Sequence, residues 1–247
     1  MALVVGVDSS TQSTKLELRD ATTGRLHASA RAPHPPVFPP RSEQAPAAWW
    51  DAFGRAAADV GRQAIDALAV GGQQHGMVVL DARGSVVRPA KLWNDTESAP
   101  DAAALLERLG AQSWSRAVGL VPVASYTVTK LAWLRRCEPE AWARLARVVL
   151  PHDWLNLRCT GVAATDRGDA SGTGYWSAVA GDWRLDLLAL IDDEHDWERC
   201  LPEVRAPAEP VGRLVGEARD LLGPALVGPG TGDNMAAALG LGLAPGD

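Results

Sequence analysis

Cysteine is scarce in this sequence. Among its 247 residues there are three cysteines, Cys137, Cys159 and Cys200, which lie far apart and form no CxxC pair. An odd and sparse set of this kind argues against a secreted disulfide framework, and it gives no spacing typical of zinc ligands. We therefore expect reduced thiols in a cytoplasmic protein.

Long apolar runs are also missing. No run approaches the roughly 20 apolar residues that are needed to span a bilayer. The N-terminal sequence MALVVGVDSS contains a short apolar run with no basic residues before it, and this predicts a buried first strand rather than a signal peptide. We expect a soluble protein without a membrane partner.

Positive charge is in deficit. The chain has 24 lysines and arginines against 30 aspartates and glutamates, which gives a formal net charge of −6. This balance provides no electrostatic footprint for nucleic acid or for an anionic membrane, so neither partner is expected. A phosphorylated ligand stays compatible with it, because a local pocket can oppose the overall sign.

The order of the expected elements indicates an α/β domain with helical insertions. Six prolines between positions 33 and 46 predict an extended loop, and Pro46 suits the first turn of a helix whose apolar spacing continues from Trp49 to Leu68. The expected strands are 3–7, 14–20 and 25–32 in an antiparallel meander, then 67–71, 77–81 and 147–150; further helices are expected at 101–109, 129–136, 139–145 and 152–158, with a mostly helical pattern over 178–222 and a helix start at 234.

The first candidate site is the turn after the opening strand, GVDSSTQSTK at 6–15. Its hydroxyls and backbone N–H groups suit a phosphate, Asp8 could orient a hydrated Mg²⁺, and Lys15 adds positive charge near a transferring phosphoryl group. An ordinary turn rich in serine and threonine would explain the hydroxyls. It would not explain an aspartate at the end of an otherwise apolar strand.

The second candidate site is GGQQHGMVVLD at 71–81. Gln73, Gln74 and His75 follow an expected strand at its C-terminal end, which is where open α/β sheets bind ligands. Amide and imidazole groups there suit hydrogen bonding to a polyol. The alternative is a polar turn whose histidine is satisfied by backbone. No second histidine or cysteine stands at metal-ligand spacing from His75, so a metal is not expected there.

The third candidate site is GPGTGDNMAAALG at 228–240. A glycine-rich turn presents Asp233 and Asn234 at the start of a helix, where an aspartate can accept the proton of an alcohol and negative charge is favoured. The alternative is an aspartate that only caps the helix. A dinucleotide fingerprint is a weak match because no acidic residue follows about 20 positions later, which makes a nicotinamide-dependent dehydrogenase the least favoured interpretation.

Together, and in the right order, these segments resemble the FGGY family of carbohydrate kinases, in particular its xylulokinase branch. DSSTQSTK is similar to the phosphate-binding turn of the actin-like and sugar-kinase superfamily, GGQQHG resembles the sugar-contacting GQxHG segment, and GTGDNMAAALG resembles the segment with the catalytic aspartate. Glycerol kinases have an Arg-Glu pair in place of Gln74 and His75, which argues against glycerol. The further blocks that resemble xylulokinases are KLWND (91–95), TVTKLAWL (127–134), PHDWLNLRCTG (151–161) and TDRGDASGTGYW (165–176).

The resemblance implies a fold and a set of site residues. The fold would be a ribonuclease H-like α/β domain of the actin-like ATPase superfamily with helical insertions. Asp233 would be the catalytic base, and Asp8 would hold Mg²⁺ through water. The residues assigned to sugar binding are Gln74, His75, Trp93, Asn94, Asp95, Asp233 and Asn234, and those assigned to the ATP phosphates are Asp8, Thr11, Ser13 and Lys15.

The activity that the resemblance implies is ATP-dependent phosphorylation of a ketopentose, D-xylulose to D-xylulose 5-phosphate, in the cytoplasm and with ATP and Mg²⁺. Family members are about twice as long, so residues 1–247 are expected to be the N-terminal sugar-binding domain, without the C-terminal nucleotide-binding domain and with little kinase activity alone. A homodimer is an assembly implied for the full-length enzyme. A kinase for ribulose or arabinitol and a non-catalytic sugar-binding module stay open as alternatives, although a binding module needs no base such as Asp233.

Overall fold

A mixed seven-stranded sheet forms the centre of the computed structural model, which describes residues 2–244. The strand order is β13-β14-β5-β1-β2-β3, with β15 also paired to β5. Strands β1 to β3 form the antiparallel meander, whereas β5 runs parallel to β1, β14 and β15. The strands of this sheet are β1 (Leu3–Ser9), β2 (Ser13–Asp20), β3 (Leu26–Pro33), β5 (Ala67–Gly72), β13 (Gly212–Arg213), β14 (Leu226–Val227) and β15 (Thr231–Gly232).

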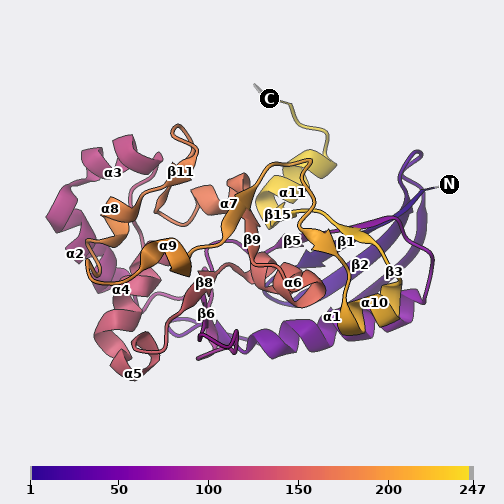
Figure 1. The fold of residues 1–247 in the computed structure, drawn as a ribbon, viewed down its shortest axis with the longest axis horizontal. Coiled ribbons are helices and arrows are strands. Elements are labelled where there is room, and N and C mark those ends of the chain that lie inside the picture. The colour runs from indigo at the N-terminus through magenta and orange to yellow at the C-terminus, as the bar shows by residue number, and fades with distance from the viewer. Residues whose placement is uncertain (1, 245–247) are drawn as a thin grey trace.

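Helices pack on this sheet and also form a second lobe beside it, which lies opposite the meander in Figure 1. Helices α1, α6 and α10 pack against one another next to the sheet, and α2 to α5 belong to the helical lobe. The helices are α1 (Pro46–Val60), α2 (Ala99–Leu109), α3 (Ala111–Val118), α4 (Thr127–Cys137), α5 (Pro139–Trp142), α6 (Pro151–Thr160), α7 (Arg167–Ser171), α8 (Leu185–Leu188), α9 (Trp197–Cys200), α10 (Gly216–Leu222) and α11 (Asp233–Gly240).

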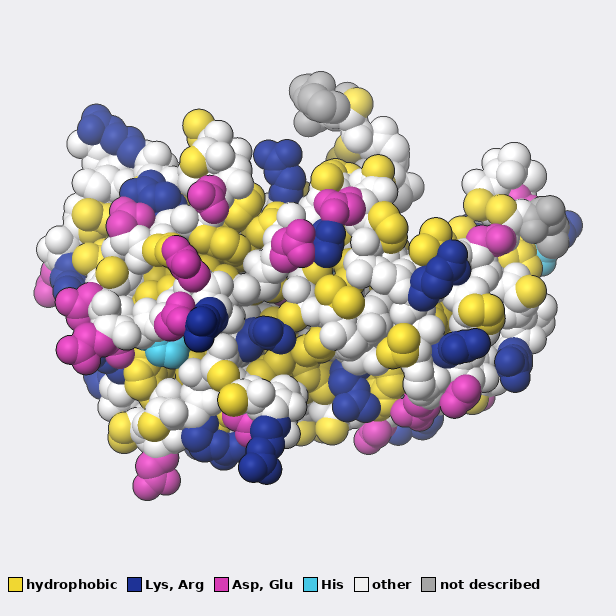
Figure 2. Space-filling model, viewed as in Figure 1, with side chains coloured by type: hydrophobic (Ala, Val, Ile, Leu, Met, Phe, Trp, Pro, Cys, Tyr) yellow, Lys and Arg dark blue, Asp and Glu magenta, His cyan; other side chains and the backbone are white. Residues whose placement is uncertain are grey.

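Four short ladders connect the segments between these elements. The paired strands are β4 (Glu43–Gln44) with β7 (Ala90–Lys91), β6 (Val78–Leu80) with β8 (Arg147–Val149), β9 (Ala164–Asp166) with β12 (Glu203–Arg205), and β10 (Trp176–Ser177) with β11 (Asp182–Trp183). On the face drawn in Figure 2, acidic and basic side chains are interspersed. No helix within residues 2–244 is both long enough and apolar enough to cross a membrane.

Two hydrophobic clusters stabilise the two lobes. The first lies between the sheet and α1, where Trp49 and Phe53 are fully buried. The second fills the helical lobe around Trp114, Leu131 and Leu134. Burial of each large apolar side chain contributes about 1.5–3 kcal/mol to folding stability. These clusters therefore stabilise the elements that carry the loops at the sheet edge.

The structure confirms the predicted meander and corrects two other predictions. The helix that begins at Pro46 ends at Val60, because Gly61 adopts a φ of 79° there, and Leu68 lies instead in the central strand β5. The helical pattern predicted for 178–222 is largely wrong, since α10 is the one helix in this stretch longer than four residues. Pro202, Pro207 and Pro210 interrupt it, and proline cannot continue a helix. Helix α3 was not predicted.

Candidate active site

The three candidate segments meet at one edge of the central sheet. In the register of the parallel strands, Asp8 of β1 pairs with Gly71 of β5, and Gly71 pairs with Thr231 of β15. The chain therefore leaves all three strands at the same carboxyl edge, where open α/β sheets bind ligands. The predicted convergence of the first turn, the Gln74 segment and the Asp233 segment is confirmed.

Side-chain hydrogen bonds connect the three segments. Asn234 Nδ2 donates to Gln74 Oε1 at 2.9 Å, and Thr11 Oγ1 donates to Gln73 Oε1 at 3.3 Å. The close approach of the Asp233 segment to Gln74 requires a glycine at position 232, since a methyl group there would overlap the Gln74 amide. Side chains of the Gln73–Gln74 segment thus bond to both of the other segments.

Asp233 is well placed to accept a proton. It is the first residue of α11 and half-buried, and Gly232 rather than Asp233 occupies the capping position, so the alternative of a capping aspartate is wrong. Its Oδ1 accepts the Asn234 N–H at 2.9 Å. Burial raises the pKa of Asp233, the Asn234 N–H opposes this, and the negative charges of Asp169 and Asp8 add to it. A carboxylate with raised proton affinity is a better base.

The hydroxyl-rich turn has the compact form expected for a phosphate site. Ser10 N donates to Ser13 O at 3.0 Å, which closes the turn. Asp8 stands at its start, where partial burial raises the pKa of Asp8 against the opposing charges of Lys15 and Arg31. Lys15 is 43% exposed and pairs with Glu17 at 2.5 Å, so its ammonium lies at the surface beside Asp8 in the ladder. The turn thus offers both signs of charge that a magnesium phosphate needs.

His75 forms a wall of the site. Its backbone has a φ of 62°, and its ring meets the Tyr126 ring edge-on at 5.0 Å between centroids. Its Nδ1 is buried and has no hydrogen-bond partner among residues 2–244. Burial lowers the pKa of His75, which Asp169 opposes and Lys130 reinforces, so the imidazole is neutral at pH 7. Nδ1 lies against Gly172, so a sugar hydroxyl would have to bind through the other nitrogen of the neutral ring.

In the segment 93–95, Trp93 is the residue that contacts the carboxyl edge of the central sheet. Trp93 is 48% exposed and its Nε1 donates to Thr11 Oγ1 at 3.0 Å. Asn94 is half-buried, and its Oδ1 has no partner within the described part of the chain. Asp95 is 1% exposed and accepts from Ser42 N at 2.9 Å. Asp95 therefore anchors this loop, whereas Trp93 is the residue that contacts the phosphate turn.

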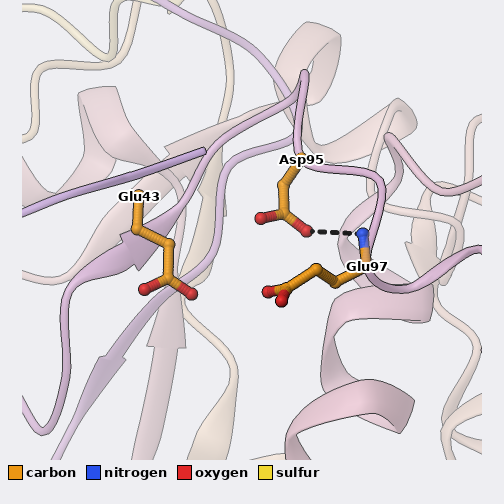
Figure 3. Close-up of side chains that lie close together, drawn as sticks. All are labelled: Glu43, Asp95 and Glu97. Carbon is orange, nitrogen blue, oxygen red and sulfur yellow. Dashed lines mark hydrogen bonds between the residues drawn. The ribbon is translucent and has the colours of Figure 1, made fainter. Parts of the chain in front are cut away.

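Asp95 belongs to an ion cluster with the partly buried Glu43 and Glu97, and the three carboxylates point toward one another in Figure 3. The spacing of these oxygens would suit a cation. Lys91 already supplies it: its fully buried ammonium lies 2.9 Å from Asp95, 2.7 Å from Glu97 and 3.2 Å from Glu43, and 3.8 Å from the centre of the Trp133 ring. The cluster is a structural clamp on the 91–97 loop rather than a metal centre.

Similarity to known proteins agrees with this geometry. Residues 3–240 match the N-terminal domain of the FGGY family of carbohydrate kinases. The chain belongs to this family. It is 50% identical to the xylulose kinase of Streptomyces coelicolor over 99% of this chain and 51% of that protein, and 35% identical to that of Escherichia coli over 98% and 50%. The chain therefore spans about half the length of these curated relatives.

Solved structures lead to the same family and confirm the fold. The crystal structure of xylulose kinase from Bifidobacterium adolescentis superimposes with a TM-score of 0.92 at 42% identity, covering 100% of this chain and 56% of that one. Plasmodium falciparum glycerol kinase, at 18% identity, shares the fold with a TM-score of 0.88 over 98% of this chain and 50% of that one. The predicted ribonuclease H-like, actin-like ATPase domain is the fold of this FGGY chain.

Sequence patterns did not reveal the residues of this FGGY domain that lie behind the edge where the three segments meet. Fully buried His152 is surrounded by Asp153, Asp166 and Asp169, whose nearest carboxylate oxygens lie 3.2, 3.5 and 2.9 Å from its ring nitrogens. All four residues lie in two sequence blocks that were recognised only for their family likeness. A histidine and an aspartate directly after the expected strand 147–150 were the available signal, since open sheets gather function at strand ends.

Proposed function

We propose that this chain is the N-terminal, sugar-binding half of an ATP-dependent ketopentose kinase whose substrate is D-xylulose. The observation that carries the proposal is the convergence of Asp233, His75 and the turn at Asp8 on one sheet edge. The curated relatives from two Streptomyces species, at 50% and 49% identity, are named xylulose kinases, which supports xylulose as the substrate. The nucleotide-binding domain would follow this one, in keeping with the length of the relatives, and the reaction would take place in the cytoplasm.

In this mechanism Asp233 removes the proton of the O5 hydroxyl of xylulose. The oxygen then forms its bond to the γ-phosphorus of ATP as the bond from that phosphorus to the ADP oxygen breaks. His75 and the Gln74–Asn234 pair orient the ketose, and Trp93 borders it. Positioning and charge compensation supply most of the rate in such transfers, because the protein makes no covalent bond.

The phosphate side of the site belongs to the first turn. Thr11, Ser13 and Lys15 would receive the ATP phosphates, with the Ser13 hydroxyl already held by Arg31 Nε at 2.7 Å. The negative charge of Asp8 adds to the raised pKa of Asp233, and carboxylate oxygen is the donor that Mg²⁺ prefers. Asp8 would hold the ion through water, and the ion would neutralise charge on the phosphates. A homodimer stays a prediction for the complete enzyme.

A coupled ADP-release assay tests the proposal. The complete enzyme should phosphorylate D-xylulose with a kcat/KM at least about tenfold above that for ribulose or arabinitol, which corresponds to about 1.4 kcal/mol of discrimination. A higher value for another ketose or polyol would replace xylulose as the substrate. Calorimetric binding of xylulose without any turnover would favour the non-catalytic module.

The contact between Gly172 and His75 yields a further prediction. A methyl group at Gly172 would overlap the His75 ring, which the residue now touches. Gly172→Ala should therefore displace the ring and raise KM for the ketose by about tenfold with a smaller change in kcat, because small misplacements of orienting groups weaken binding geometry. Steady-state kinetics of the complete enzyme give both constants.

Gly54→Ala is the matched control. Its added carbon would lie 3.8 Å from Glu217 Oε1, an ordinary contact, in the interior of α1 where alanine is favoured over glycine. This control should keep the KM of the unsubstituted enzyme. An unchanged KM in Gly172→Ala would remove His75 from the sugar site.

A further inference from the structure

The position of Asp233 is not set by its own helix. None of the residues of α11 is buried, so this helix gains little from packing. The strand before it, β15, has only two residues, Thr231 and Gly232, and both pair with the end of β5. The place of the Asp233 carboxylate therefore depends on what holds the segment 229–232.

Thr231 is held from the side by helix α7. Its Oγ1 donates to Asp166 Oδ2 at 2.9 Å. Asp166 caps α7 by accepting Gly168 N at 2.7 Å and Asp169 N at 3.2 Å. A side chain at Gly168 would come within 2.8 Å of Thr231 Oγ1, so the first turn of α7 lies directly against Thr231. The position of β15 thus depends on the Asp166 carboxylate, which is itself held by two backbone N–H groups of α7.

Helix α6 holds the same segment from behind. Fully buried His152 donates through Nδ1 to Asp169 Oδ2 at 2.9 Å, and its Nε2 lies 3.2 Å from Asp153 and 3.5 Å from Asp166. The His152 ring packs on Gly230: a Cβ added to Gly230 would lie 3.2 Å from His152 Cδ2. A Cβ added to Gly72 would lie 2.7 Å from the Cβ of His152. Asn156 Nδ2, one turn later, donates to Pro229 O at 2.8 Å. The segment is therefore enclosed between α6, α7 and β5.

The charges of this group favour a fixed arrangement. Burial alone would lower the pKa of His152, but Asp153, Asp169 and Asp166 outweigh it and raise the pKa to about 10. At neutral pH the ring is a cation that faces the side chains of Asp153, Asp166 and Asp169. Burial raises the pKa of Asp153 to about 7, against the opposing charge of His152. A buried network of this kind is costly unless its members stay paired, so it resists rearrangement.

We propose that His152 and Asp166 are positioning residues for Asp233, which act through the hydroxyl of Thr231 and the strand β15. Both side chains are buried, so they would act on the base through the strand rather than through the substrate. They fix the two-residue strand that precedes Asp233, and this holds the Asp233 carboxylate in the position from which it can accept the proton of the sugar hydroxyl. The proposal rests on the proposed kinase function of the site. It adds the set of contacts that determines where the catalytic base lies.

The clean test is Thr231→Val, which keeps the size and branching of the side chain but cannot donate to Asp166. In the complete enzyme, kcat for D-xylulose should fall by about 10- to 100-fold, the range expected for a misplacement near 1 Å, with KM within about twofold and an unchanged melting temperature. Thr231→Ser keeps the hydroxyl and should keep kcat within about threefold of the unsubstituted enzyme.

A second readout does not need catalysis. Amide hydrogen exchange at residues 231–234 of the 247-residue chain should be about tenfold faster in Thr231→Val, which equals about 1.4 kcal/mol of lost protection, and unchanged in Thr231→Ser. Full kcat in Thr231→Val, equal losses in both variants, or unchanged exchange in Thr231→Val would each overturn the proposal. If the unsubstituted enzyme phosphorylates no sugar, the kinase function fails, and the exchange rates alone then decide whether this network positions Asp233.

Discussion

Asp233→Asn is expected to lower kcat for D-xylulose by about 10²–10⁴-fold in the complete enzyme, while KM stays within a factor of about two. Asparagine has nearly the same shape and keeps an oxygen that can accept the Asn234 N–H, now bonded to Asp233 Oδ1. It cannot accept a proton, so the loss is that of general-base catalysis. Coupled ADP-release kinetics with xylulose as the varied substrate measure both constants.

The pH dependence gives an independent check on the same residue. Burial and the neighbouring carboxylates of Asp169 and Asp8 raise the pKa of Asp233 above the value of an ordinary aspartate. Since the base works only when deprotonated, kcat/KM should fall as the pH falls through this raised pKa. The residual rate of Asp233→Asn should lack this acidic limb.

Asp220→Asn is the matched control, because Asp220 is an exposed aspartate on helix α10. It should keep both constants. If Asp233→Asn turned over xylulose at close to the normal rate, another group would have to be the base, and the interpretation of the three converging segments as a kinase site would be wrong.

Lys91→Met is expected to lower the free energy of unfolding by about 3–5 kcal/mol, the largest stability effect of any single change considered for this domain. Methionine has a similar length and apolar stem. It lacks the ammonium that now contacts Glu43, Asp95 and Glu97, so these carboxylates would repel one another in a site where Lys91 and Asp95 are inaccessible to water. Urea denaturation followed by tryptophan fluorescence measures the change.

Two variants separate charge from packing. Arg199→Met removes a cation that is 89% exposed and pairs with Asp196 at 3.4 Å, so it should cost less than about 1 kcal/mol. Adding Glu97→Gln to Lys91→Met removes one of the repelling charges and should recover part of the lost stability. A loss in Lys91→Met no greater than that in Arg199→Met would show that the cluster does not hold the 91–97 loop.

Much of the fold could be predicted from local patterns. The apolar run at Leu3, the turn at residues 21–24 and the proline at position 46 each produced the expected element. Where local patterns failed, long-range contacts decided. Leu68 fits the helical spacing of α1, but it lies in β5 because Gly61 ends the helix and the sheet then buries Leu68 to 1% exposure.

The candidate site divides in the same way. Asp8, His75 and Asp233 were identified because each is a polar residue at the end of an expected strand or the start of an expected helix, a position that sequence reveals. Asp95 was assigned to the sugar pocket, yet its carboxylate is enclosed by Lys91 and Ser42. Burial of a charged group depends on partners that lie far away in sequence, and no local pattern predicts it.

The sequence by itself determines where the strands end, which positions are glycine and which chemical groups stand at the sheet edge. All of these depend on near neighbours in the chain. Only the folded chain decides that β15 lies beside β5, and that His152 and Asp166 reach the strand before Asp233 from positions 79 and 65 residues upstream of Thr231. These contacts form when the hydrophobic cores bring distant segments together, and that packing sets the geometry of the base.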